Sequence, residues 1–223
     1  MPDSSLNPSL DGYQRRISST SWSDAKGSAT TNATSYSYTT ASSNLGVYAR
    51  ATSGRGVTTY YCYRSYFQFD VSGESGTVDS AVIKLTLDAL GTPDPTSRTC
   101  VLKGASTLSG NATDHGNVYS SGTTYYANYS DAVAVSSTAG IHTFTLNSDG
   151  ILRLNSAIGS GTFTVGLVSS SYDGGIGTPS AGGNYTRTDV TYVESTNSAK
   201  RPILEIDYEA VVARNSILFG TNF

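Results

Sequence analysis

The sequence predicts an all-β fold, most simply an antiparallel two-sheet jelly-roll sandwich with one short helix. The chain has 223 residues, of which 14% are charged, and tyrosine occurs 16 times among abundant Ser, Thr and Gly. This composition disfavours helices and favours strands and turns. Apolar residues also recur at every second position in several segments, with Gly, Pro, Asn or Ser between them, which is the pattern of half-buried strands joined by turns.

The N-terminal part reads as an arm, a strand and a polar tract. Residues 1–10 carry Pro2 and Pro8 and predict an extended arm. A short strand is expected over 11–17. Residues 18–44 contain Thr and Tyr but few aliphatic side chains, so we expect a loop or a shallow edge strand there.

A clearer strand over 45–51 leads through Ser53-Gly-Arg-Gly into a long aromatic strand over 58–71. With a period of two, one side of this strand is expected to form core: Tyr61, Tyr63, Ser65, Phe67, Phe69 and Val71. The other side holds Cys62, Arg64, Tyr66, Gln68 and Asp70, of which we assign Arg64 and Asp70 to structural pairing or capping.

The second half of the chain supplies the remaining strands and the helix. Strands are expected over 81–88, 98–105, 141–146, 163–168 and 202–208, with an edge strand over 188–193. Asn147 or Ser148 is a suitable N-cap for the only helix that we expect, which Gly159 ends. Residues 106–138 and 169–183 form polar excursions. We therefore expect one sandwich domain over 11–209 and a tail over 210–223.

Charge and cysteine content restrict the classes of partner. The formal net charge is −3, which gives no basic field for nucleic acid. Residues 1–30 lack the apolar segment of a signal peptide, and no stretch approaches the length of a membrane span. Cys62 and Cys100 lie in expected strands, where they form either a disulfide or, as in a reducing cytosol, two buried thiols.

Catalytic chemistry finds little support in the pattern of residues, so we expect no enzyme, no metal and no cofactor. His115 and His142 have no cysteine or carboxylate near them at ligand spacing. Glu205 and Asp207 share one strand face about 7 Å apart, within the range of glycosidase carboxylates, but acids on an outer strand commonly face water. Asp70 and Asp88 end strands and fit turn caps, with calcium binding as the alternative.

Aromatic side chains in the expected loops are the candidate contacts for a glycan or a protein partner. A flat ring can stack on a sugar or anchor an interface at low entropic cost. The alternative is that these rings pack the loops onto the sheets. The candidates are Tyr125, Tyr126, Tyr129, Tyr172 and Tyr185, together with Tyr60 at a strand end.

The C-terminal tail is a second candidate for partner binding. Its apolar residues follow the last expected strand, and exposing them would lower solubility unless another subunit buried them. We expect an assembly peptide that adds a strand to a neighbour or fills its groove, with a tail folded back on its own sandwich as the alternative. The residues concerned are Val211, Val212, Ile217, Leu218, Phe219 and Phe223.

Motifs over residues 58–209 resemble those of DNRLRE-type domains. Arg64-Ser-Tyr-Phe-Gln-Phe-Asp-Val, followed by Thr77-Val-Asp-Ser-Ala-Val-Ile-Lys-Leu-Thr-Leu, looks like the central signature of that family. Phe163-Thr-Val-Gly-Leu and Lys200-Arg-Pro-Ile-Leu-Glu-Ile-Asp-Tyr resemble its later strands, and Asp149-Gly-Ile-Leu-Arg-Leu-Asn occupies the place of its short helix. The resemblance implies a β-sandwich similar to carbohydrate-binding modules, found in bacterial surface proteins and tailed-phage virion proteins. The family's Trp-rich middle segment is missing, since Trp22 is the only tryptophan.

The opening Asn7-Pro-Ser-Leu-Asp-Gly-Tyr and the Ser/Thr/Gly tract around Trp22 resemble the phage-associated members. We therefore expect a non-enzymatic structural virion protein of a tailed bacteriophage: a capsid decoration, cement or fibre subunit, made in the host cytoplasm, that binds other virion proteins as a homo-oligomer. The alternative is a carbohydrate-binding module of an extracellular or cell-surface assembly, which binds polysaccharide through the tyrosine loops. Neither hypothesis involves nucleic acid or a membrane.

Overall fold

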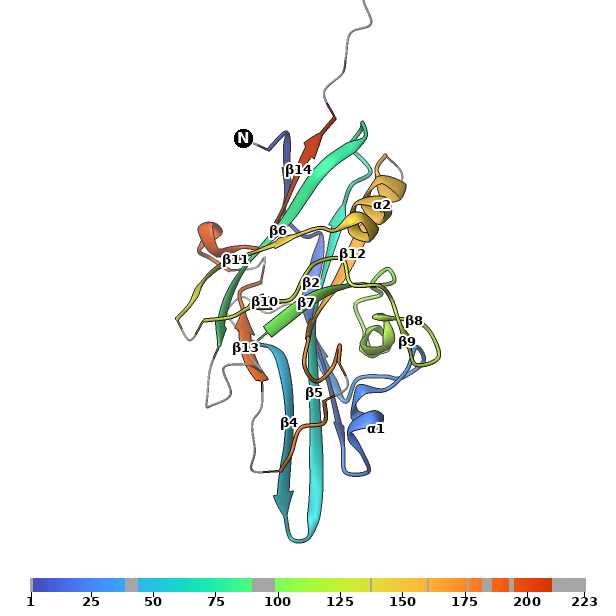
Figure 1. Ribbon diagram of the computed structural model, residues 1–223, viewed down its shortest axis with the longest axis vertical. Coiled ribbons are helices and arrows are strands. Elements are labelled where there is room, and N and C mark those ends of the chain that lie inside the picture. The colour runs from blue at the N-terminus through green and yellow to red at the C-terminus, as the bar shows by residue number, and fades with distance from the viewer. Residues whose placement is uncertain are drawn as a thin grey trace, which may run out of the picture.

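The computed structural model describes residues 2–38, 44–89, 99–136, 138–159, 161–175, 177–181, 186–192 and 195–209. The fold is all-β, as the sequence predicts, with antiparallel ladders throughout its large sheet (Figure 1). The strands are β1 (Ser4–Leu6), β2 (Leu10–Ser18), β3 (Ser35–Ser37), β4 (Asn44–Gly54), β5 (Val57–Asp70), β6 (Val78–Ala89), β7 (Thr99–Gly104), β8 (Tyr119–Ser121), β9 (Thr124–Tyr125), β10 (Val133–Ala134), β11 (Gly140–Thr145), β12 (Thr162–Ser169), β13 (Thr186–Val190) and β14 (Ile203–Tyr208).

The ladders branch at β5 and β6, which gives a sandwich of two layers. One layer has the order β3–β2–β5–β12–β7–β10, and the other has β1–β14–β6–β11. β13 pairs with β6 and with β4, and β4 pairs with β5, so this route joins the layers at one side. The small β8–β9 hairpin forms a separate sheet.

The core lies between the two layers and uses the side of β5 that the sequence predicts. Phe67 and Phe69 of β5 and Ile83, Leu85 and Leu87 of β6 are all fully buried in one cluster. Burying a large apolar side chain contributes about 1.5–3 kcal/mol relative to leaving it exposed. The expectation of an alternating core strand over 81–88 is therefore confirmed.

The predicted helix is confirmed as α2 (Ser148–Ala157), and Asn147 caps it by accepting from the Gly150 N–H. A second, short helix, α1 (Trp22–Lys26), corrects the expectation of one helix. Single-turn 3-10 helices occur at η2 (Ala112–Gly116) and η3 (Ser198–Lys200). The expected arm is also partly structured, because β1 pairs with β14.

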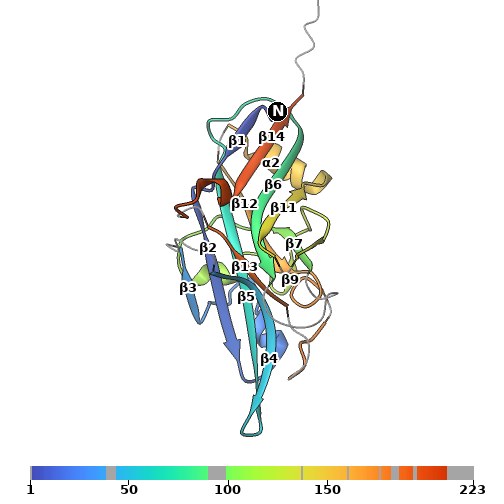
Figure 2. The same ribbon diagram turned by 90° about the vertical axis from the view of Figure 1, so that its left-hand side faces the viewer.

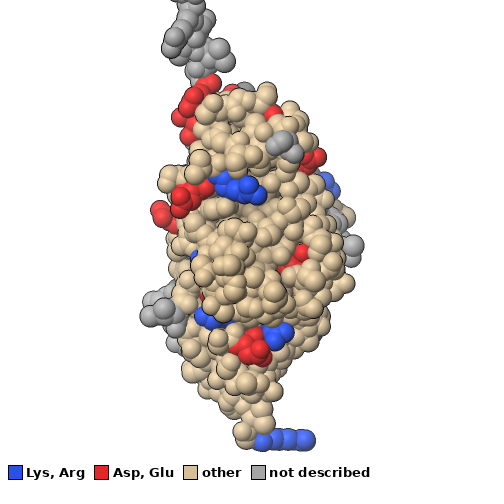
Figure 3. All heavy atoms as spheres, turned by 90° about the vertical axis from the view of Figure 1, so that its right-hand side faces the viewer, with Lys and Arg blue, Asp and Glu red and all other residues tan. Residues whose placement is uncertain are grey.

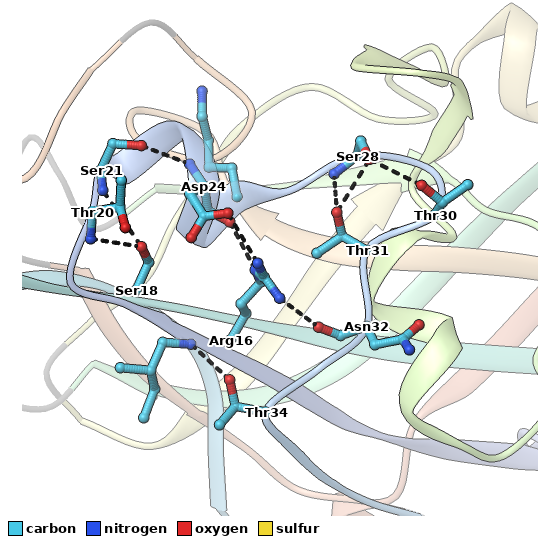
Figure 4. A network of polar contacts seen from close by, with 12 residues as sticks. Arg16, Ser18, Thr20, Ser21, Asp24, Ser28, Thr30, Thr31, Asn32 and Thr34 are labelled. Atoms are coloured by element: carbon cyan, nitrogen blue, oxygen red, sulfur yellow. Dashed lines mark hydrogen bonds and ion pairs between the residues drawn. The ribbon is translucent and has the colours of Figure 1, made fainter.

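The tract over 18–34 has few aliphatic side chains, and hydroxyl groups together with Arg16 bind many of its polar groups. Ser18 Oγ accepts from the N–H groups of Thr20 and Ser21, and Ser21 Oγ caps α1 at Asp24. Arg16 of β2 pairs with the Asp24 carboxylate at 3.0 Å. Figure 4 shows these contacts beside those of Ser28 and Thr31. Side-chain oxygens thus replace ladder hydrogen bonds in this covering segment.

The middle of the side of β5 opposite the core is also buried, which corrects the interpretation of one core face. Cys62, Arg64 and Tyr66 have no exposed surface. The reason is a third layer, in which the 18–34 tract, the η2 and β8–β9 segment and the turn after β12 cover the sheet. From this layer, Trp22 of α1 packs onto Cys62 of β5 and Ala49 of β4.

The β4–β5 hairpin extends beyond the rest of the sandwich in both ribbon views (Figures 1 and 2). Arg55 and Gly56 form its turn with φ of 50° and 78°. Positive φ at both central residues is the geometry of a type I′ turn, whose twist matches that of the paired strands. The turn predicted at Ser53-Gly-Arg-Gly is thus confirmed.

Candidate functional site

A network of buried polar side chains lies on the covered side of β5. The Arg64 guanidinium donates to Asp173 through Nε at 2.6 Å and Nη2 at 2.7 Å, and both side chains are almost fully buried. Arg64 also donates to the carbonyls of His115 and Lys26, at 2.6 and 2.8 Å. The Tyr125 hydroxyl donates to Asp173 at 2.7 Å.

The electrostatics of this network keep its members in fixed ionisation states. Burial opposes ionisation of Asp173, but the charge and hydrogen bonds of Arg64 outweigh it and lower the pKa of the carboxyl. Burial and the nearby Arg64 charge lower the pKa of His115 well below its usual value, so the ring is neutral at pH 7. Burial lowers the pKa of Lys103 and raises that of Tyr125.

This network binds the third layer to the sheet, because Arg64 of β5 contacts α1, η2 and the turn after β12. Its buried, paired groups are arranged for structural support. Structural pairing of Arg64 is thereby confirmed. Asp70 accepts from the N–H and the hydroxyl of Ser72, which confirms its assignment as a turn cap.

The structure divides the predicted tyrosine contacts among separate places. Tyr125 is half-buried in the Arg64 network, and Tyr172 is half-buried against the Trp22 cluster. Tyr126 and Tyr129 line one groove. Tyr185 lies outside the described residues, as do the tail residues Val211, Val212, Ile217, Leu218, Phe219 and Phe223.

The groove, here called the α2 groove, runs between α2 and the segment after β9. Its first hollow, of about 380 Å³, is lined by Tyr126, Ala127, Tyr129, Asp149, Leu152, Arg153 and Ser156. A second hollow of about 270 Å³ shares Arg153 and Ser156 and adds Thr107, Ala157, Gly161 and Thr162. The first is mainly apolar and the second mainly polar. Figure 3 shows that the face carrying α2 has few charged side chains.

Helical spacing explains how α2 builds its wall of the groove. Asp149, Leu152, Arg153 and Ser156 lie at i, i+3, i+4 and i+7 and therefore share one face. The opposite face packs inward through the fully buried Leu154. Leu152 is 71% exposed, the most exposed of the large hydrophobic side chains in the described part of the chain.

A second surface, here called the hairpin face, lies on the core side of β5 beyond the core. Tyr63 stacks on Tyr13 of β2, with ring centroids 6.1 Å apart, and meets Tyr48 of β4 edge-on at 5.5 Å. Arg15 Nη1 donates to the Tyr63 hydroxyl and Arg50 Nη1 to the Tyr48 hydroxyl. The face consists of Tyr13, Arg15, Tyr48, Arg50, Tyr61 and Tyr63, which are half-buried except for the buried Tyr63.

Tyr63 is buried, as expected, but Tyr61 is only half-buried, and reasoning from the sequence missed the hairpin face because it assigned both rings to the core. The predicted alternation of side chains along β5 is correct, but β5 extends past the strands of the opposing layer. A length comparison of 58–71 with 81–88 is the signal that could have found this face.

The remaining candidate groups take structural positions. Cys62 and Cys100 are free, buried thiols, so the alternative without a disulfide is confirmed. Glu205 accepts from Lys84 Nζ at 2.7 Å, and Asp207 accepts from the Ser80 hydroxyl at 3.0 Å, both on the outer side of β14.

Asp88 and His142, which were considered as alternative metal ligands, do not form a metal cluster in the described part of the chain. Asp88 lies opposite Asp189 in the β6–β13 ladder, and His142 lies opposite Leu85. Among the described residues, no three His, Cys, Asp or Glu side chains come together in a way that could hold a metal ion. None of the described helices is long and apolar enough to span a membrane.

Comparison with known proteins gives no match, either to a family model or to a curated protein. The resemblance to DNRLRE-type domains therefore stays a prediction from the motifs.

Proposed function

We propose that the chain is a non-enzymatic structural subunit of a tailed-bacteriophage virion, a capsid decoration or fibre protein that self-associates by burying aromatic surface. The motifs that resemble phage-associated DNRLRE-type domains support the location. The hairpin face supports the mode of action, and it is the observation that carries the proposal.

The composition of the hairpin face suits an interface. Tyrosine and arginine are enriched at the energetic centres of protein interfaces, where lysine and glutamate are depleted. Cross-strand stacking and the bonds from Arg15 and Arg50 already orient these rings, so little side-chain entropy remains to be lost on association. The hairpin extends beyond the sandwich, where a neighbouring subunit can reach it (Figure 2).

Sedimentation equilibrium of the full chain tests this proposal. We expect a concentration-dependent oligomer that Tyr48→Ala with Tyr61→Ala weakens at least tenfold. Tyr36→Ala is the matched control, because Tyr36 is 44% exposed and lies on the opposite side of the sheet, in register with Gln14. A wild-type chain that stays monomeric at about 200 μM, or an equal effect of the control, would contradict self-association through this face.

The α2 groove favours a second candidate function, carbohydrate binding. The volume of its first hollow, about 380 Å³, falls in the range of small-ligand sites, about 300–1,000 Å³, and the groove combines an aromatic wall with hydroxyl groups. Binding of an oligosaccharide to the groove, detected by amide chemical shifts of α2 residues, would support this function. Shifts confined to other parts of the chain would exclude this groove.

A further inference from the structure

Arg153 occupies the boundary between the two hollows of the α2 groove with most of its hydrogen-bonding capacity unused. Within the described chain its guanidinium makes one hydrogen bond, from Nη1 to Ser156 Oγ at 3.3 Å, and no ion pair. A guanidinium has five N–H donors in a planar fork that matches a carboxylate. Arg153 can therefore bind an anionic group without losing its contact with Ser156.

Tyr126 provides a rigid aromatic wall beside this arginine. Its hydroxyl hydrogen-bonds with the Ser106 hydroxyl at 3.1 Å, and its backbone N–H donates to the Val118 carbonyl at 2.9 Å. Leu152 stands on the α2 side of the same hollow and is largely exposed. The hollow thus offers an aromatic ring and an aliphatic side chain, a lining that suits a flat molecule with an apolar face.

Groups that exchange hydrogen bonds with hydroxyls line the rest of the groove. Thr107, Thr162 and Ser156 lie at the polar hollow, and the Asp149 carboxylate lines the apolar one. A hydroxyl-rich ligand can donate to Asp149 and accept from Thr107 and Thr162, whereas the Ser156 hydroxyl already donates to the Arg153 carbonyl oxygen at 2.7 Å. A monosaccharide brings one carboxylate, which Arg153 can pair, whereas an acidic peptide brings several, and those beyond the reach of Arg153 would lie in the same hollow as Asp149, which disfavours the peptide.

We propose that the α2 groove binds a carboxylate-bearing saccharide, with the sugar ring against Tyr126 and its carboxylate on the Arg153 guanidinium. This inference rests on the second candidate function and specifies its ligand class. Arg153 determines specificity, because a neutral sugar can use the ring and hydroxyl contacts but not the charged bond.

The test titrates the isotopically labelled full chain with single sugars at about 0.1 M salt, where exposed charges remain only partly screened. Glucuronate, galacturonate and N-acetylneuraminate are each compared with glucose, galactose and N-acetylglucosamine. We expect at least one acidic sugar to shift the Arg153 side-chain N–H and the Ser156 and Thr162 amide signals with at least tenfold lower Kd than its neutral counterpart.

Variants separate specificity from binding. Arg153→Gln removes the preference for the acidic sugar, whereas Arg55→Gln, an exposed arginine at the hairpin turn, leaves it unchanged. Equal Kd values for acidic and neutral sugars would overturn the inference and leave carbohydrate binding standing. Absence of shifts with every sugar would overturn both. Equally strong binding of an Asp-rich octapeptide would overturn the saccharide and indicate a protein partner.

Discussion

Replacing Asp173 by Asn tests whether the buried Arg64–Asp173 ion pair holds the third layer on the sheet. The carboxylate accepts from Arg64 Nε and Nη2 at 2.6 and 2.7 Å and from the Tyr125 hydroxyl at 2.7 Å. Asparagine keeps the size of the side chain but not the negative charge. The Arg64 guanidinium, which has no exposed surface, then lacks its counterion.

The expected cost is large because a buried charge is left uncompensated. Removing one partner of such a pair typically costs about 3–5 kcal/mol. For a domain of this size each kcal/mol lowers Tm by about 2–4 °C, so Asp173→Asn is expected to lower Tm by roughly 6–20 °C. The matched control is Asp24→Asn in the exposed Arg16–Asp24 pair, where about 0–1 kcal/mol is typical.

Equilibrium urea unfolding of both variants measures these changes. The pH dependence gives a second readout, since the pKa of Asp173 is lowered in the folded state. A carboxyl group whose pKa is lowered by folding stabilises the folded state at pH values above its unfolded pKa of about 3.9. This stabilisation is lost as the pH falls through the folded pKa. The difference in free energy of unfolding between wild type and Asp173→Asn should therefore become smaller at acidic pH. A loss below about 1 kcal/mol at pH 7 would refute the assigned role of the pair.

Acidification also acts on His115, because burial and the Arg64 charge hold its folded pKa well below its unfolded value. The free energy of unfolding of wild type should therefore fall by up to about 1.4 kcal/mol per pH unit below pH 6, and urea unfolding of His115→Leu should show a smaller pH dependence. Burial raises the pKa of the Cys62 thiol and raises that of Cys100 to about 12, so neither should react with a thiol reagent at pH 8 until the chain unfolds; rapid labelling of the native chain would contradict this. Gly116→Ala would place a Cβ 2.6 Å from the Ala29 carbonyl oxygen and should cost about 1–3 kcal/mol, whereas Gly73→Ala meets open space and should cost under about 0.5 kcal/mol in the same unfolding assay.

The strands with alternating apolar residues were predictable, because their burial follows from local spacing. Ile83, Leu85 and Leu87 lie in the core as expected, and Asn147 caps the expected helix. These assignments depend on residues within one element and on the period of that element.

The third layer could not be predicted, because it depends on contacts between distant segments. Arg64 and Asp173 are 109 positions apart, and nothing near either residue shows that they meet. Tyr125 was predicted to contact a partner because it is an aromatic residue in an expected loop, but its hydroxyl donates to Asp173 of this ion pair. The α2 groove likewise joins Tyr126 to a helix that follows it by more than 20 residues.

Photo-cross-linking through the hairpin face tests the proposed assembly most directly. Benzoylphenylalanine replaces Tyr61 in one variant and the exposed Tyr36, on the other side of the sheet, in another. The account predicts covalent dimers from position 61 and few from position 36. Equal cross-linking at the two positions, or none at position 61 at concentrations where oligomers form, would contradict it.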